Sequence, residues 1–282
     1  MEEKLKAAKE MTIIRCCGLV SPNIDNYTRA ADIYIAAGNS YRMENKLTLA
    51  YRMFKKAAKC YQKVRDMHES SIYYLHEAAK CIKKIDNFMY VDLMHKIVNL
   101  EKQHGRVIQV ANAYANIADV HEKQNIPKLA LKYNQLAYEY YDLYGSEKTC
   151  WNFLGKIISL HIELKEYNSS ITKFELLIEE TKGEAVYRFK NADLILRICL
   201  CHLLENDYVE TEKRLKKYTE ILPEFNNTLE CKLLQNIIEC CENHDNILLI
   251  EKVEEYEDRK KLDKQAKTLI DRLCAMIGHG LA

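Results

Sequence analysis

The sequence predicts an all-α protein in which stacked helical hairpins form a right-handed solenoid and a helical bundle closes the C-terminal end. Glycine and proline are scarce, with eight and three among 282 residues, whereas β-sheets need many turns. Apolar and small residues recur at spacings of three and four, which is the period of a helix face. Paired alanines recur about every twenty residues, which fits one hairpin per roughly 40 residues. The pairs are Ala36–Ala37, Ala57–Ala58 and Ala78–Ala79.

The clearest single hairpin spans Asn125–Tyr167. Its first helix has Pro127 in the opening turn, where the missing N–H of proline costs nothing, and it ends at Gly145. Ser146 is a candidate N-cap of the second helix. That second helix matches the W-x2-L-G-x2-Y opening of a tetratricopeptide repeat, with Ile in place of Tyr. The matching residues are Trp151, Leu154, Gly155 and Ile158. We therefore predict tetratricopeptide-like hairpins with somewhat longer arms.

The remaining helices follow in close succession. Connections of two to five residues make neighbouring helices antiparallel. For the solenoid, residues 1–222, the expected helices are Glu2–Met11, Tyr27–Arg42, Leu47–Val64, Ser70–Ile85, Tyr90–Lys102, Val107–Lys123, Pro127–Tyr144, Lys148–Leu164, Ser170–Thr181, Ala185–Leu204 and Tyr208–Leu222. For the C-terminal bundle and tail, residues 223–282, they are Asn227–Cys241, Ile247–Asp258 and Leu262–Ile277.

The segment between the first two helices breaks the helical pattern. Its apolar residues are Ile13, Ile14, Leu19 and Val20. Two interpretations are open: the segment packs against the next helix, or it dips into the surface of a bilayer. The N-terminus is acidic and amphipathic, unlike a signal peptide, and no window reaches the roughly 18–20 apolar residues of a membrane span. We expect a cytoplasmic protein that reaches membranes only peripherally.

Charge is unevenly distributed along the chain. The 42 Lys and Arg residues nearly balance the 41 Asp and Glu residues overall. Between Lys46 and Arg106, however, thirteen basic residues face six acidic ones, and between Ile221 and Asp258 ten acidic residues face two basic ones. A polarised chain of this kind can hold unlike partners at its two ends. The lysines between Lys55 and Lys63 are not interleaved with aromatic residues as they are in RNA-binding proteins. We therefore expect them to form a solvent-exposed helix edge that binds no nucleic acid.

The eleven cysteines fall mostly in apolar helix stripes, which favours reduced thiols. Two Cys–His groups, Cys199–His202 and Cys240–His244, raise the hypothesis of a zinc site. Residues i and i+2 of a helix point about 200° apart, so Cys199 and Cys201 cannot bind one ion together. No nucleotide-binding or hydrolase motif occurs. We expect no cofactor, no metal and no enzymatic activity.

One block carries the most specific similarity to a known family. Residues Glu230–Asn246 read ECKLLQNIIECCENHDN and are followed by VEEYEDRKKLDKQ. Other matching segments are AADIYIAAGNSYR near the start, HEAAKCIKK, the Gly105–Arg106 junction, LCH at Leu200–His202 and LPEF at Leu222–Phe225. Together they resemble the soluble NSF attachment proteins, SNAPs, and the alpha type more than the gamma type. The resemblance covers nearly the full length.

The resemblance implies an adaptor rather than an enzyme. Members of this family bind a SNARE four-helix bundle and recruit the hexameric ATPase NSF, which disassembles the bundle. The family uses a basic concave face toward the SNAREs, and Arg106 and Lys156 stand at matching positions. Two neighbouring family lysines are replaced by Asn112 and Asn152, so this face is less basic here.

The resemblance also implies sites for NSF and for a membrane. The acidic surface of the family toward NSF falls on Glu239 and Glu242, with Asn243 in place of a third acid. A penultimate leucine stimulates NSF in the family; Leu281 is kept, whereas Gly-His-Gly replaces the acidic run before it. In the region of the family's membrane loop, the paired phenylalanines are replaced by Ile13, Ile14, Leu19 and Val20.

Two functions from different classes follow. The first is an adaptor for SNARE disassembly in vesicle fusion and intracellular protein transport. The alternative is a generic tetratricopeptide-like scaffold that binds one extended peptide in its groove. An enzyme would need convergent ionisable side chains in a pocket, which solenoids rarely provide.

Overall fold

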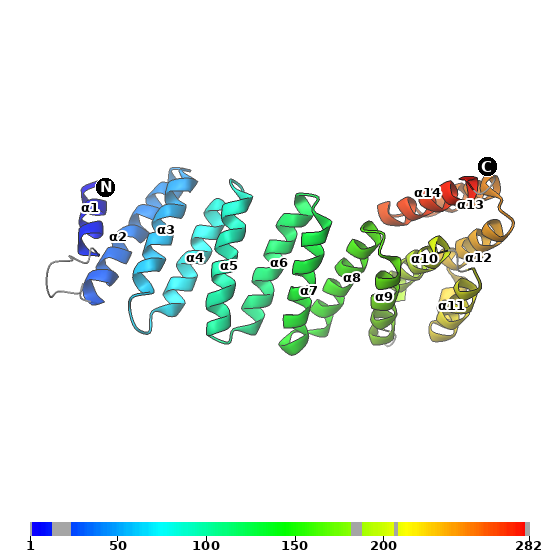
Figure 1. Cartoon of the computed structure of the whole chain (residues 1–282), viewed down its shortest axis with the longest axis horizontal. Coiled ribbons are helices and arrows are strands. Elements are labelled where there is room, and N and C mark those ends of the chain that lie inside the picture. The colour runs from blue at the N-terminus through cyan, green and yellow to red at the C-terminus, as the bar shows by residue number, and fades with distance from the viewer. Residues whose placement is uncertain (1, 13–23, 182–187, 206–207, 280–282) are drawn as a thin grey trace. The chain divides into compact units, whose positions relative to one another are not determined.

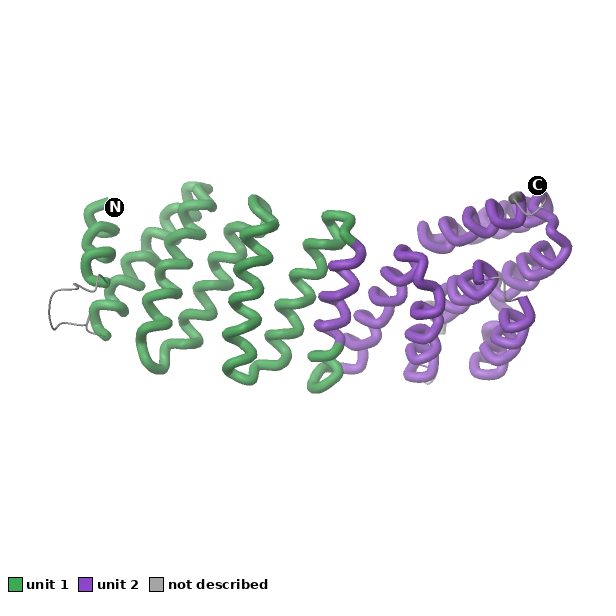
Figure 2. The backbone as a smooth tube through the Cα atoms, viewed as in Figure 1, with its two compact units in different colours: residues 1–126, 139–145 green, residues 127–138, 146–282 purple. Residues whose placement is uncertain are grey.

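A computed structural model describes residues 2–12, 24–181, 188–205 and 208–279 (Figure 1). In those residues it contains fourteen α-helices, one 3-10 helix and no β-strand, which confirms the predicted fold class. The chain divides into two compact units, residues 1–126 with 139–145 and residues 127–138 with 146–282 (Figure 2). Each unit is described by itself below.

Unit 1 is a row of antiparallel helices that stand side by side in sequence order (Figure 1). Short turns force each helix to reverse direction, so the apolar stripe of one helix packs on the next. Its helices are α1 (Glu2–Met11), α2 (Ile24–Met43), α3 (Leu47–Tyr61), α4 (His68–Ile82), α5 (Asn87–Gln103) and α6 (Val107–Lys123).

Small residues set the distance between the helices of unit 1. Five of the six paired alanines are buried, but Ala36 is exposed because it lies on the outer side of α2. The approach of α2 to α3 depends instead on Gly38, where an added Cβ would lie 2.8 Å from Cε1 of Phe54.

Unit 2 begins in α7 (Pro127–Tyr144), whose first part, residues 127–138, belongs to this unit and whose remainder belongs to unit 1. Pro127 occupies the first turn of α7, and the Ser146 hydroxyl accepts a hydrogen bond from the Thr149 N–H at the start of α8, as predicted. The remaining helices are α8 (Glu147–Glu163), α9 (Tyr167–Thr181), α10 (Arg188–Leu204), α11 (Tyr208–Ile221), the 3-10 helix η2 (Pro223–Asn227), α12 (Leu229–Glu242), α13 (Asn246–Glu257) and α14 (Lys264–His279).

One continuous apolar core runs through unit 2, from Trp151 in α8 to Ile277 in α14. Helix α14 packs along α10, and its side chains also reach α8 and α9. Gln265 Nε2 donates to the Ser159 carbonyl at 2.8 Å, and Arg272 Nη1 donates to the Tyr167 hydroxyl at 2.9 Å. The predicted boundary between residues 222 and 223 lies inside this unit, where α11 meets η2.

None of the helices in the described ranges is long and apolar enough to cross a membrane. The nine cysteines of those ranges are free thiols, eight of them buried. Burial raises the pKa of Cys201 and of Cys241 to about 12, so these thiols stay protonated at neutral pH. They serve as small apolar packing residues.

Candidate partner-binding sites

Helix α12 carries the two glutamates predicted to meet NSF. Thr228 caps the helix, because its hydroxyl accepts a hydrogen bond from the Cys231 N–H at 3.2 Å. The stripe that includes Leu234, Ile237 and Cys241 is buried in the core of unit 2. Burying that stripe leaves Glu239 and Glu242 exposed, so both carboxylates are available to a partner.

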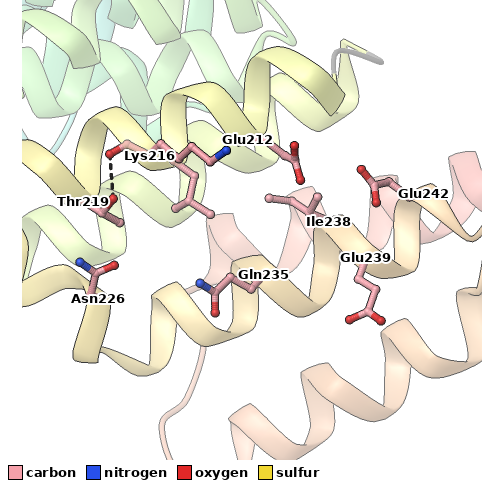
Figure 3. Close-up of a pocket in the computed structure, with 9 residues that line it drawn as sticks. Glu212, Lys216, Thr219, Asn226, Gln235, Ile238, Glu239 and Glu242 are labelled. Carbon is pink, nitrogen blue, oxygen red and sulfur yellow. Dashed lines mark hydrogen bonds between the residues drawn. The ribbon is translucent and has the colours of Figure 1, made fainter.

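A groove of about 350 Å³ lies between α11 and α12, and both predicted glutamates line it. Figure 3 shows Glu242 of α12 and Glu212 of α11 facing each other across the groove, whereas Glu239 points to the other side of α12. Apart from Lys216, the charged residues that line it are acidic: Glu212, Glu239 and Glu242. Sequence analysis missed Glu212, because only the packing of α11 on α12 places it opposite Glu242.

An ion-pair network around the buried carboxylate of Glu230 fixes the other end of α12. The carboxylate of Glu230 accepts hydrogen bonds from the Tyr256 hydroxyl at 2.8 Å and from Lys260 Nζ at 2.6 Å. Lys260 also donates to Asp193 of α10 at 2.8 Å. Burial alone raises the pKa of Glu230, but the bonds from Lys260 and Tyr256 outweigh it and hold the pKa below its ordinary value. The network therefore holds α12, the segment after α13 and α10 in one arrangement.

The first residue predicted to meet the SNAREs, Arg106, lies in unit 1 at the N-cap of α6. Its guanidinium is already engaged, with Nη2 2.7 Å from Oε1 of Glu69 and Nη1 3.7 Å from Oε2 of Glu101. Asn112, one of the two replaced lysine positions, accepts a hydrogen bond from the Tyr141 hydroxyl. Arg106 is thus paired with two carboxylates of unit 1 rather than being an isolated surface cation.

The second predicted residue, Lys156, lies in unit 2 on α8. Its side chain is exposed, and its ammonium lies 5.9 Å from the centre of the Phe153 ring. Asn152, the other replaced lysine position, is exposed on the same helix. The two predicted SNARE-binding residues therefore belong to different units.

The remaining predicted site residues lie outside the described residues. These are the membrane-loop residues and the penultimate leucine: Ile13, Ile14, Leu19, Val20 and Leu281. Within the ranges that the structure describes, no three His, Cys, Asp or Glu side chains are grouped so that they could hold a metal ion.

Comparison with known proteins gives a match over almost the whole chain. Residues 2–277 match the family model described as "Soluble NSF attachment protein, SNAP". The beta-soluble NSF attachment protein of Bos taurus is 26% identical over 246 residues, which cover 86% of this chain and 82% of that protein. A probable vesicular-fusion protein sec17 homolog of Neurospora crassa is 27% identical over 249 residues, which cover 87% and 85% of the two chains. The human alpha-soluble NSF attachment protein is 24% identical over 246 residues, covering 86% and 82%.

Proposed function

This chain belongs to the soluble NSF attachment protein family, and on that premise we propose that it is an adaptor that binds SNARE complexes and recruits the ATPase NSF for their disassembly in vesicle fusion and intracellular protein transport. The observation that carries this conclusion is the family match over residues 2–277. Proteins of this family are adaptors, so the chain acts by holding its partners together rather than by catalysing a reaction.

The mechanism we propose is mechanical coupling. Helical hairpins with close-packed cores transmit force because their interiors deform little. In unit 2, the continuous core ties α12 to α8–α10, so a pull on the acidic groove is carried into the helices around Lys156. Arg106 and Lys156 supply the proposed SNARE contacts, and the proposed NSF contact is the α11–α12 groove with Glu239 and Glu242.

Charge reversal on α12 tests the NSF contact. We expect Glu239→Lys with Glu242→Lys to weaken the recruitment of NSF at least tenfold and to leave the binding of SNARE complex unchanged, because the proposed contact is electrostatic. The recruitment by the unchanged protein should also fall as salt is raised. Binding is measured by pull-down on immobilised SNARE complex at two salt concentrations.

Glu147→Lys with Glu163→Lys is the matched control, because both are exposed glutamates of unit 2 that do not line the groove, and the pair changes the net charge by the same amount. An equal loss with this control would mean that net charge alone matters. Leu281→Ala extends the test to the tail: it should leave SNARE binding intact and reduce the stimulated ATPase activity of NSF. Loss of both activities, or of neither, would contradict the assignment of Leu281.

The apolar segment after α1 is proposed as a peripheral membrane contact of a cytoplasmic protein. Ile13→Ser with Ile14→Ser should slow the disassembly of SNARE complexes anchored in liposomes and spare soluble complexes, because only the former depend on attachment to the bilayer. Disassembly is followed by loss of fluorescence transfer between labelled SNAREs. Equal effects on the two substrates would refute the membrane contact.

A further inference from the structure

The outer face of helix α13 exposes two neighbouring isoleucines. Ile247 is 82% exposed and Ile250 is 46% exposed. Residues three apart on a helix are neighbours on its surface, so the two side chains form one apolar patch. Apolar side chains scattered singly over a surface are ordinary, whereas adjacent ones on one helix face offer a partner something to pack against.

The packing of the opposite side of α13 turns this patch outward. Leu249 is fully buried in the core of unit 2, and Leu248 packs against the same core. Asp245 caps the helix, because its carboxylate accepts a hydrogen bond from the Leu248 N–H at 2.9 Å. The core and the cap together fix the rotation of α13, so Ile247 and Ile250 are held on its outer side.

The same face becomes acidic one turn further along. Glu251 and Glu254 are exposed, and they follow Ile247 by four and seven residues, the spacing of one helix face. The only basic residue of α13, Lys252, is paired with Glu255 at 2.7 Å. Negative charge repels an anionic bilayer or a nucleic acid, so the partner that fits this face is a protein with a basic surface.

The patch adjoins the proposed NSF contact. Helix α12 ends at Glu242 and α13 begins at Asn246, so Ile247 lies at the same end of unit 2 as Glu242. The last turn of α14 reaches this end as well, because a Cβ added to Gly278 would lie 3.7 Å from Nδ2 of Asn246. A partner seated on the acidic groove at Glu242 therefore has Ile247 within reach.

We propose that the outer face of α13 is a second contact for NSF, in which Ile247 and Ile250 enter an apolar pocket of the ATPase while Glu251 and Glu254 meet its lysines or arginines. This inference rests on the proposed function. It adds an apolar component to a contact that is otherwise electrostatic. Because salt screens charges and does not weaken apolar burial, part of the recruitment of NSF persists at high salt.

Ile247→Ser with Ile250→Ser tests this contact in the full chain. NSF retained on immobilised SNARE complex is measured at low and at high salt. We expect the double variant to weaken the recruitment of NSF at least tenfold at both salt concentrations. SNARE binding should stay unchanged, because both isoleucines are exposed and outside the core. The loss caused by Glu239→Lys with Glu242→Lys should instead shrink as salt is raised.

Leu129→Ser with Leu176→Ser is the matched control, because both are partly exposed leucines of unit 2 that lie in other helices, α7 and α9. An equal loss with the control, or a loss of SNARE binding in the isoleucine variant, would overturn the proposal. Full recruitment of NSF by the isoleucine variant would overturn it as well. If that variant also abolished a dimer of the unchanged chain in sedimentation, the face would belong to a second copy.

The failure of this inference can be told apart from the failure of the proposed function. Recruitment that is lost in Glu239→Lys with Glu242→Lys but kept in Ile247→Ser with Ile250→Ser would refute the α13 contact alone. An unchanged chain that retains no NSF in the presence of SNARE complex would refute the adaptor function, and the α13 contact with it.

Discussion

At the scale of single residues, Gly38 decides how closely α2 and α3 can pack. The ring of Phe54 that faces it is buried, and the Arg42 guanidinium lies 5.4 Å from the centre of that ring. The ring therefore cannot move aside without disturbing its own neighbours. A side chain at position 38 would overpack this contact.

Two glycine substitutions test this contact. Gly38→Ala should destabilise the protein by roughly 1–2 kcal/mol, because overpacking outweighs the gain in helix propensity. Gly155→Ala is the matched control: Gly155 also lies inside a helix, but its added Cβ would meet nothing within 4 Å. Gly155→Ala should stabilise the protein by about 0.5–1 kcal/mol. Urea denaturation measures both, and a stabilising Gly38→Ala would contradict the packing argument.

Some of the residues that shape the turns could be predicted from the sequence and others could not. Gly105, which follows the predicted helix Tyr90–Lys102, has the positive φ of 67° that glycine tolerates best. Asn45, Asp66 and Asn125 also adopt positive φ at helix ends, as their residue types permit. Lys165 adopts the same conformation with φ 62°, and its type gives no hint of it. The Glu166 N–H donates to the His161 carbonyl at 2.9 Å and closes this helix end.

At the scale of elements, the predicted helices are all present, and their starts are the least accurate part. The predicted helix Tyr90–Lys102 in fact begins at Asn87, because Asp86 accepts a hydrogen bond from the Met89 N–H at 2.9 Å. Aspartate is a strong N-cap, so this signal was available in the sequence. The hydrophobic period identifies a helix reliably, whereas its first turn depends on the cap.

Helix α12 depends on the network of Glu230, Tyr256 and Lys260, and the network gives it a defined pH response. The pKa of Glu230 is held below 4.5, so its contribution to the free energy of unfolding is present above pH 4.5 and lost as pH falls through the lowered value. Burial alone lowers the pKa of Lys260, but the bonds to Asp193 and Glu230 raise it above 10.5. The contribution of Lys260 to the free energy of unfolding is present below pH 10.5 and is lost as pH rises through the raised pKa.

We predict that Glu230→Gln removes the acid-side part of this response. The free energy of unfolding of the variant should be lower by roughly 2 kcal/mol at neutral pH, which is the range for a hydrogen bond to a charged group. Its free energy of unfolding should also fall less steeply than that of the unchanged protein below about pH 4.5. The free energy of unfolding is measured by urea titration between pH 3 and pH 8. A variant whose acid limb is as steep as that of the unchanged protein would show that other carboxylates dominate.

At the scale of the whole molecule, the sequence predicts the helical architecture and the family, whereas the surroundings of the predicted site residues depend on packing. Hydrophobic period and short connections identify the hairpins, because each is a local property. The groove that joins Glu212 to Glu242 and the cluster that joins Glu69 to Arg106 depend on packing between helices. A local pattern contains no information about such pairs.

The division of the chain into a solenoid, residues 1–222, and a C-terminal bundle, residues 223–282, stays a prediction. The core of unit 2, however, includes residues of α8–α10 together with residues of α12 and α14. Such a core forms between segments far apart in the chain, and no local change of composition reveals it.

The central claim is that the chain couples a SNARE complex to NSF. The most direct measurement is a pull-down in which the immobilised chain is offered NSF, assembled SNARE complex, or both, with a non-hydrolysable ATP analogue present. We predict that NSF is retained strongly only when SNARE complex is also present. A chain that retains one extended peptide tightly and ignores NSF, with or without SNARE complex, would contradict the adaptor function and favour a generic peptide-binding scaffold.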